Sequence, residues 1–335
     1  MGGPATLPIT SLFATAETRS GPQQTAVTSH AGASERFAES PFQTRPRRDV
    51  DGTIVVPEVV REFLDRRSGK TPPAISTGLK SLDSAIVGLR PGKMFVVAGR
   101  PGMGKTAFAD NTRRSVIAQG HVVLQFSLEM SADEIAEREI SWRAQVGLMK
   151  VSDGRRASDA EAARVAEVAQ NPGTPGLWKI YDTCFQMDDI AEAARLEKAV
   201  ADAAGLKIGL VIIDYLQLIG GGSNDNRQMA VSGFSRTSKL LAKELGCSVM
   251  ALSQLNRSCE YRDDKRPLMA DLRESGAIEQ DADIIMFVYR HCQYDPMADR
   301  SEAELIIRKQ RGGPTGTVHL VFNQTTVTFH DMEAK

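Results

Sequence analysis

The chain has 335 residues, 41% of them hydrophobic, and it carries 41 lysines and arginines against 42 aspartates and glutamates. This length allows two domains of ~100–200 residues each, or one large α/β domain with unstructured sequence beside it. The balanced charge excludes an overall basic field, so a nucleic acid would have to be bound by a local patch or by loops repeated in an assembly. No apolar run approaches the ~20 residues of a membrane span. The four cysteines form no C-x-x-C pair, which predicts reduced thiols in a cytosolic protein and no zinc site.

The first part of the chain is predicted to be a disordered tail followed by a linker. Residues 1–54 are rich in Ser, Thr, Ala, Gly and Pro, and their scattered apolar residues are too few to bury a core. Between Val55 and Arg67, apolar residues recur at helical spacing, which predicts a short amphipathic helix. The stretch up to residue 74 is then a linker, and residues 75–335 are predicted to form one α/β domain.

A phosphate-binding motif follows the first predicted strand of that domain. The apolar run from Met94 to Ala98 predicts a buried strand, and the next eight residues match the pattern G-x-x-x-x-G-K-[ST]. In such a loop, backbone N–H groups surround phosphate oxygens, the lysine reaches the β and γ phosphates, and the hydroxyl is offered to Mg²⁺. The alternative is a Gly-rich turn that matches by accident, against which the preceding strand and following helical pattern argue. The motif predicts a nucleoside triphosphate site at Gly99, Arg100, Pro101, Gly102, Met103, Gly104, Lys105 and Thr106.

Helix and strand patterns alternate through the rest of the chain, as expected for a layered domain with a mostly parallel sheet. Serine–glutamate capping boxes at Ser131 and Ser158 predict the starts of two helices. Other helices are predicted at residues 187–204 and 229–245, and strands at 122–129, 177–182, 208–214 and 247–253. Short β-rich runs follow at 284–289, 304–309, 317–322 and 326–330.

Three polar side chains are predicted to lie where parallel strands end, which is where open α/β sheets bind ligands. Asp214 follows an apolar strand and is a candidate to hold Mg²⁺ through water. Glu129 ends the strand after the phosphate-binding loop, so it could activate the attacking water or simply begin the next helix. Gln254 ends a third strand and could hydrogen-bond a γ-phosphate or water.

Several motifs resemble the C-terminal motor domain of DnaB-type replicative helicases, in order and at ordinary spacing from about Ile75 to Phe329. They are Phe126-Ser127-Leu128-Glu129-Met130, Asp214-Tyr215-Leu216-Gln217, Ser253-Gln254-Leu255-Asn256-Arg257, Asp271-Leu272-Arg273-Glu274-Ser275-Gly276 and Lys309-Gln310-Arg311-Gly312-Gly313-Pro314. The resemblance implies a RecA-like fold and a hexameric ring. It also implies ATP-driven translocation along single-stranded DNA, usually 5′ to 3′, by a bacterial or phage-encoded protein of the cytoplasm and nucleoid.

The resemblance also assigns roles to individual residues. Glu129 becomes the water-activating carboxylate and Gln254 the sensor of the γ-phosphate. Lys309 and Arg311 match a pair that reaches the γ-phosphate held by a neighbouring subunit. The DNA-binding residues would be Arg273, Glu274 and Gly276 in one pore loop, with Arg227 a weaker candidate at the end of the Gly-rich stretch 220–227.

The N-terminal part of the chain departs from the family's pattern, which leaves functions other than a helicase open. Members usually carry a much longer N-terminal helical collar that receives primase and loader, and residues 1–54 cannot form it. Docking of the helix at 55–67 on a neighbour could still close a ring. Two alternatives therefore stand beside the helicase: a RecA- or RadA-like recombination or repair ATPase, and a nucleotide-gated adaptor ring that does not unwind DNA.

Overall fold

The fold is described from a computed structural model. It describes residues 64–65, 67–68, 74–171, 173, 176–184, 186–214, 224–272 and 275–332; of residues 224–229 and 275 it describes only the backbone. The predicted tail and nearly all of the predicted linker helix lie outside these residues.

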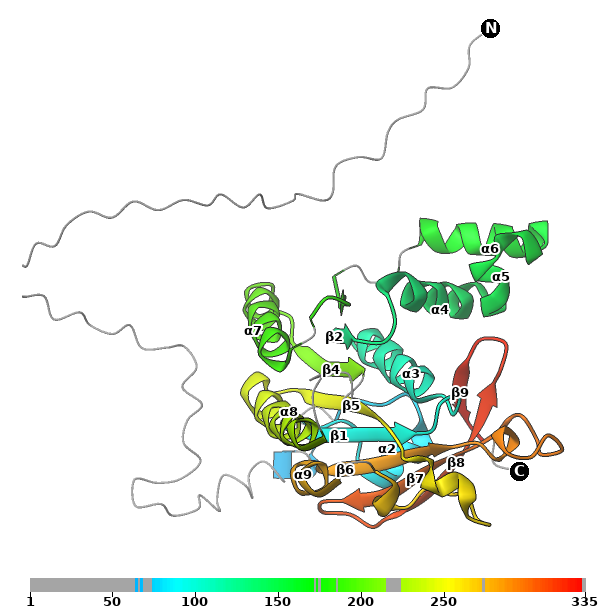
Figure 1. The fold of residues 1–335 in the computed structure, drawn as a ribbon. Coiled ribbons are helices and arrows are strands. Elements are labelled where there is room, and N and C mark those ends of the chain that lie inside the picture. Colours follow the sequence, from blue (N-terminus) through cyan, green and yellow to red (C-terminus); the bar gives the residue numbers. More distant parts are fainter. Residues whose placement is uncertain are drawn as a thin grey trace, which may run out of the picture. The chain divides into compact units, whose positions relative to one another are not determined.

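In the described part of the chain, nine strands form one sheet in the order β3-β2-β4-β5-β1-β6-β7-β8-β9 (Figure 1). The first six strands of this order are parallel, and β7, β8 and β9 are antiparallel to their neighbours. A mostly parallel sheet was predicted from the alternating pattern, and it is confirmed. The strands are β1 (Met94–Gly99), β2 (Val122–Ser127), β3 (Trp178–Tyr181), β4 (Ile208–Asp214), β5 (Ser248–Gln254), β6 (Ile284–Tyr289), β7 (Glu302–Gln310), β8 (Gly316–Asn323) and β9 (Thr328–Asp331).

Helices connect the parallel strands. The α-helices are α2 (Lys80–Ile86), α3 (Lys105–Ala118), α4 (Ala132–Ala144), α5 (Leu148–Ser152), α6 (Asp159–Gln170), α7 (Met187–Ala203), α8 (Asn224–Leu245) and α9 (Ser275–Asp281). Short 3₁₀ turns are η1 (Gly154–Arg156), η2 (Arg257–Tyr261), η3 (Met269–Asp271) and η4 (His291–Gln293). Both predicted capping boxes are present, at the starts of α4 and α6. None of the described helices is long and apolar enough to cross a lipid bilayer.

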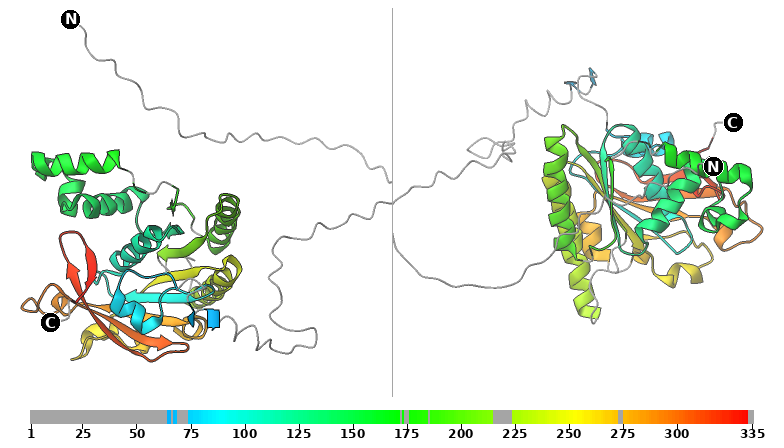
Figure 2. Two further views of the ribbon diagram at one scale, coloured as in Figure 1. Left: turned by 180° about the vertical axis from the view of Figure 1, so that it is seen from behind. Right: turned by 90° about the horizontal axis from the view of Figure 1, so that it is seen from above.

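The sheet buries both of its faces, as its uninterrupted apolar strands require. On one face, Val96 and its alternate neighbours pack with apolar residues of α7, α8 and α9, such as Ala194, Phe234 and Ile278. On the other face, Phe95 and Val97 pack against α2, α3 and the side chains of β8 and β9. Figure 2 shows the green α7 and yellow-green α8 along one side of the strands. Strand β1, which leads into the phosphate-binding motif, is therefore anchored between two apolar layers.

Two predicted loop segments are partly helical. Helix α8 begins at Asn224, five residues before its predicted start, so Arg227 lies in a helix and not in a flexible loop. Helix α9 likewise includes Gly276, which was expected in a pore loop. Glycine and asparagine lower helix propensity, but tertiary packing overrides propensity where a helix face is buried, as Phe234 and Ile278 are here.

Candidate nucleotide-binding site

The phosphate-binding loop, Glu129, Asp214 and Gln254 lie at one edge of the sheet, where the parallel strands end. In the parallel registers, Gly99 pairs with Gln254, and Ser127 pairs with Asp214. Strands β2, β4, β5 and β1 are adjacent in that order, so their carboxyl ends form a continuous edge. Glu129 lies two residues beyond the end of β2 and is exposed. Parallel strands thus bring together side chains that are far apart in the sequence.

The phosphate-binding loop depends on glycine where it enters α3. Gly104 is the residue before the helix and has a φ of 101°, which side-chain-bearing residues rarely adopt. A Cβ atom at this position would also lie 3.0 Å from the ring of Phe329. The segment that follows β5 also holds the loop, because Arg100 donates hydrogen bonds to Glu260 at 2.7 Å and to the carbonyl of Leu255 at 2.8 Å. The loop is therefore preorganised, with the N-terminus of α3 available to an anion.

The predicted metal-binding pair is in contact. Thr106 Oγ1 donates a hydrogen bond to Asp214 Oδ2 at 2.9 Å. Asp214 is 2% exposed, and its Oδ1 is buried with no hydrogen-bond partner among the described residues. Burial raises the pKa of Asp214 to about 6, although the bond from Thr106 and the charge of Lys105 oppose the rise. An orphaned carboxylate oxygen beside a hydroxyl fits Mg²⁺, which prefers oxygen ligands and keeps several waters.

The buried carboxylate of Asp214 should cost stability at neutral pH. Because its pKa is raised in the folded state, the folded chain holds this proton more tightly than the unfolded chain, and stability falls as pH rises from about 4 to about 6. Without nucleotide and Mg²⁺, Asp214→Asn should therefore raise the free energy of unfolding at pH 8 by about 3 kcal/mol. The gain should disappear near pH 4.

Denaturant unfolding of both proteins between pH 4 and pH 8 measures this difference. Asp263→Asn is the matched control, because Asp263 is exposed and carries the same charge. An Asp214→Asn variant that is less stable than the parent at pH 8 would contradict the prediction.

Lys105 and Glu129 are linked electrostatically to this pair. Burial lowers the pKa of Lys105, while the charges of Asp214 and Glu129 raise it and that of Arg100 lowers it. The carboxylate of Glu129 also raises the pKa of Asp214. These mutual electrostatic effects indicate that the lysine and both carboxylates lie near one another beside the phosphate-binding loop.

Lys309 and Arg311 lie at the opposite edge of the sheet. Lys309 pairs with Ile285 near the start of β6, and the Arg311 N–H donates to the carbonyl of Asp283 at 2.8 Å. The N–H of Asp283 in turn donates to the carbonyl of Met94, the first residue of β1, whereas the phosphate-binding loop follows the last residue of that strand. With a rise of about 3.3 Å per residue, the ends of this six-residue strand lie roughly 17 Å apart. Neither side chain can reach its own chain's loop.

Comparisons with known proteins identify the family. Residues 74–331 match the family described as DnaB-like helicase C terminal domain. The chain belongs to this family. It is 42% identical over 270 residues to the replicative DNA helicase DnaB of Haemophilus influenzae, covering 78% of this chain and 55% of the relative. It is 39% identical over 279 residues to the DnaB of Geobacillus stearothermophilus, covering 82% of this chain and 60% of that protein. The chain thus spans little more than half the length of these curated relatives.

Solved structures agree with the family. One structure, described as an ATPase domain, matches with a TM-score of 0.74 and 34% identity, over 82% of this chain and 98% of that one. A structure of a DnaB-like replicative helicase and its interactions with primase matches with a TM-score of 0.75 and 34% identity, over 83% and 67% of the two chains. The resemblance to DnaB-type helicases and the RecA-like fold are confirmed.

Two of the four predicted DNA-binding residues lie in described helices, and the other two do not lie in the described part of the chain. Arg273 and Glu274 lie outside the described residues, as does the Gly-rich stretch before Asn224. Gly276 is exposed in the first turn of α9, and Arg227 belongs to the first turns of α8. Arg227 and Gly276 therefore belong to two helices, α8 and α9, that contact one another.

Sequence reasoning missed the contacts that fix α3 against α4, the helix that follows Glu129. Glu139 of α4 accepts bonds from Arg113 at 2.6 Å and Arg114 at 2.9 Å, both on α3. Arg113 is 1% exposed and lies 3.6 Å from the ring centre of Trp178. Because α3 starts in the phosphate-binding loop and α4 follows Glu129, this cluster links the helices that adjoin these two parts of the site. Arginines in a helical pattern give no signal of burial, so the sequence could not have revealed it.

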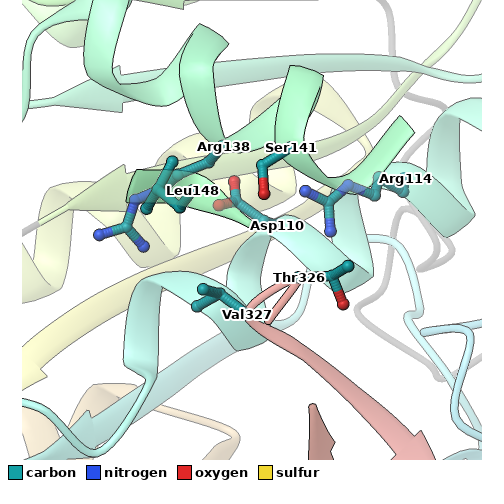
Figure 3. A pocket seen from close by; sticks show the side chains of 7 residues that line it. All are labelled: Asp110, Arg114, Arg138, Ser141, Leu148, Thr326 and Val327. Atoms are coloured by element: carbon teal, nitrogen blue, oxygen red, sulfur yellow. The ribbon is translucent and has the colours of Figure 1, made fainter. Parts of the chain in front are cut away.

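A small hollow lies farther along α3. Figure 3 shows Asp110, Ser141 and Arg114 grouped on one side of it, with Thr326 and Val327 on the other. Asp110 Oδ1 and one terminal nitrogen of Arg114 are buried there without hydrogen-bond partners among the described residues. The hollow joins α3 and α4 to the β8–β9 turn, so it lies beside the nucleotide site and not in it.

Proposed function

We propose that this chain is the motor part of an ATP-dependent DNA helicase of the DnaB type, which moves 5′ to 3′ along single-stranded DNA as a hexameric ring during replication. The observation that carries the proposal is the meeting of the phosphate-binding loop, Asp214, Glu129 and Gln254 on one sheet edge. Membership of the helicase family supports the same conclusion. The motor corresponds to residues 75–335, with 1–54 as a tail and 55–74 as a linker, and it would work in the cytoplasm on the nucleoid.

The nucleotide chemistry follows from the residues at that edge. The loop from Gly99 to Thr106 and the N-terminus of α3 bind the phosphates, and Lys105 balances charge on the β and γ phosphates. Glu129 takes a proton from the attacking water, and Gln254 hydrogen-bonds the γ-phosphate or that water. Thr106, and Asp214 through water, would hold Mg²⁺, which supplies charge neutralisation on the phosphate oxygens.

The remaining catalytic charge is proposed to come from the next subunit. Lys309 and Arg311 lie roughly one strand length away from their own loop, at the far edge of the sheet. In a head-to-tail ring, that edge faces a neighbour's nucleotide. A cation supplied across the interface completes the site only when two subunits are correctly docked, which couples hydrolysis to subunit motion.

DNA contact is assigned to the segment from Arg273 to Gly276, which runs into the first turn of α9. Arg273, Glu274 and Gly276 would grip the phosphate backbone through a side chain and backbone N–H groups, with Arg227 as an additional contact. Such contacts carry no base information, as a sequence-independent motor requires. One matching structure describes interactions with primase, so primase and a helicase loader are proposed as further partners.

The first test is ATP hydrolysis by the full chain, measured with and without single-stranded DNA. We expect hydrolysis that single-stranded DNA stimulates. No hydrolysis under either condition would overturn the proposed function.

The DNA assignment makes a separate prediction. Arg273→Ala should weaken binding to different single-stranded sequences about equally, and the slope of log affinity against log salt should shrink by ~0.7 for each phosphate that the variant no longer contacts. Basal hydrolysis should change little, whereas its stimulation by DNA should fall. Arg257→Ala, which changes charge by the same amount outside the proposed loop, is the control. Collapse of basal hydrolysis with unchanged DNA affinity would place Arg273 at the nucleotide site or an interface instead.

A further inference from the structure

Arg290 is a buried arginine that contacts the phosphate-binding loop and belongs to none of the motifs described above. It follows the last residue of β6 and is 5% exposed. Its backbone N–H donates to Met103 Sδ at 3.3 Å, and its Nη1 lies 3.5 Å from the carbonyl oxygen of Gly102. Both contacts are to the tip of the loop, on the side supported by β6. The residue after β6 therefore holds one side of the loop, and the segment after β5 holds the loop through its contacts with Arg100.

Among the described residues, no carboxylate pairs with the guanidinium of Arg290. Its Nη2 donates to the carbonyl of Arg300 at 3.2 Å and lies 3.6 Å from the sulfur of Cys292. Its guanidinium lies 3.8 Å from the ring centre of Phe322, and its buried Nε has no hydrogen-bond partner among the described residues. Burial lowers the pKa of the guanidinium and the contact with Cys292 opposes this, while no carboxylate of the described residues contributes. An arginine nevertheless stays charged at neutral pH.

Two other buried arginines of this region differ in this respect. Arg113 is paired with Glu139 at 2.6 Å, and Arg100 with Glu260 at 2.7 Å. A buried charge without a counter-charge is costly, so its presence beside a loop that binds phosphates calls for an explanation. The ring of Phe322 offsets part of the cost, but a cation–π contact does not balance the charge.

We propose that Arg290 is a positioning residue for the nucleotide, and that the phosphates of the bound nucleotide are its missing counter-charge. Through Gly102 it fixes the tip of the loop so that the backbone N–H groups face the phosphates. Through space it adds a positive charge behind that loop in a region from which water is excluded. The proposal rests on the proposed function, since it concerns the same nucleotide site.

A structural role and an electrostatic role predict different results. If Arg290 only fills space and holds Phe322, its loss lowers the melting temperature and affects all nucleotides alike. If its charge serves the phosphates, its loss weakens ATP binding more than ADP binding, because ATP carries the additional γ-phosphate. A lysine, which keeps the charge but lacks the planar fork, should then recover part of the lost affinity.

The experiment is calorimetric titration of ATP and of ADP, with Mg²⁺, into the full chain and into Arg290→Met, Arg290→Lys and Arg300→Met. Arg300→Met is the matched control, because this exposed arginine contributes only its carbonyl to the contact. We expect Arg290→Met to weaken ATP binding on the order of tenfold and ADP binding less, with Arg290→Lys in between and Arg300→Met like the parent. Thermal unfolding without nucleotide identifies variants that have not folded.

Three results would overturn the proposal. They are an Arg290→Met variant that binds ATP like the parent, equal weakening of ATP and ADP, or an Arg290→Lys variant with no more affinity than Arg290→Met. If Arg290→Met does not fold, the ratio of ATP to ADP affinity in Arg290→Lys decides: a ratio lower than the parent's supports the proposal, and an unchanged ratio overturns it. A parent chain that binds neither nucleotide would overturn the proposed function itself, which is a distinguishable outcome.

Discussion

Replacing Lys105 by alanine is expected to reduce ATP hydrolysis at least ~100-fold, the size of effect seen when one preorganised charge donor is removed from a transition state. Lys105 is partly buried, and its ammonium interacts with both Asp214 and Glu129. Its loss removes the cation nearest the β and γ phosphates and leaves the carboxylates facing them. Nucleotide affinity should fall as well.

Glu129→Gln should separate binding from turnover. The amide keeps the size of the side chain but cannot accept a proton, so hydrolysis should fall by ~10²- to 10⁴-fold while ATP binding is retained. Glu137→Gln is the matched control, because Glu137 lies in α4, where its carboxylate accepts a hydrogen bond from Ser152. Near-normal hydrolysis by both Lys105→Ala and Glu129→Gln, with single-stranded DNA present, would rule out this active site.

Mixing two inactive variants should restore part of the hydrolysis. Arg311→Ala and Lys105→Ala should each be poorly active alone. Arg311 lies beside Asp283, at the far end of the sheet from Lys105. In a mixed ring, the intact loop of an Arg311→Ala subunit can therefore lie beside the intact Arg311 of a Lys105→Ala subunit. Hydrolysis by the mixture should therefore exceed the mean of the two separate variants.

The mixing experiment requires proof that subunits exchange, for which fluorescence transfer between labelled chains is suitable. Arg308→Ala mixed with Lys105→Ala is the control, since Arg308 bonds the carbonyl of Pro267 within its own chain. If exchange is demonstrated and the Arg311→Ala mixture is no more active than the mean, Arg311 does not act in a neighbouring subunit's site.

The sequence predicted the sheet and its functional edge because the relevant signals are local. An apolar strand followed by a glycine-rich motif specifies a strand, a turn and a helix start, and Gly104 does adopt the conformation that glycine favours. Asp214 and Gln254 each terminate an apolar run, and parallel pairing then aligns the ends of those strands.

The features that were missed depend on contacts between distant segments. Glu139 and Arg290 are unremarkable charges in the sequence, and only packing brings the first to Arg113 and the second to Gly102. The reversal of direction at β7, which carries Lys309 and Arg311 away from the loop, depends on an antiparallel pairing that periodicity does not encode. Helices α8 and α9 extend into segments of weak propensity because their apolar faces are buried.

Unwinding of a forked DNA duplex tests the central claim most directly, because it separates a motor from a nucleotide-gated ring that only binds. The full chain, supplied with ATP and Mg²⁺, is given duplexes that carry a 5′ tail, a 3′ tail or both, with Glu129→Gln as the control that binds ATP without turnover. The account predicts strand separation that requires ATP hydrolysis and a 5′ tail, and none with Glu129→Gln. Hydrolysis stimulated by single-stranded DNA without strand separation on any of the three substrates would contradict it.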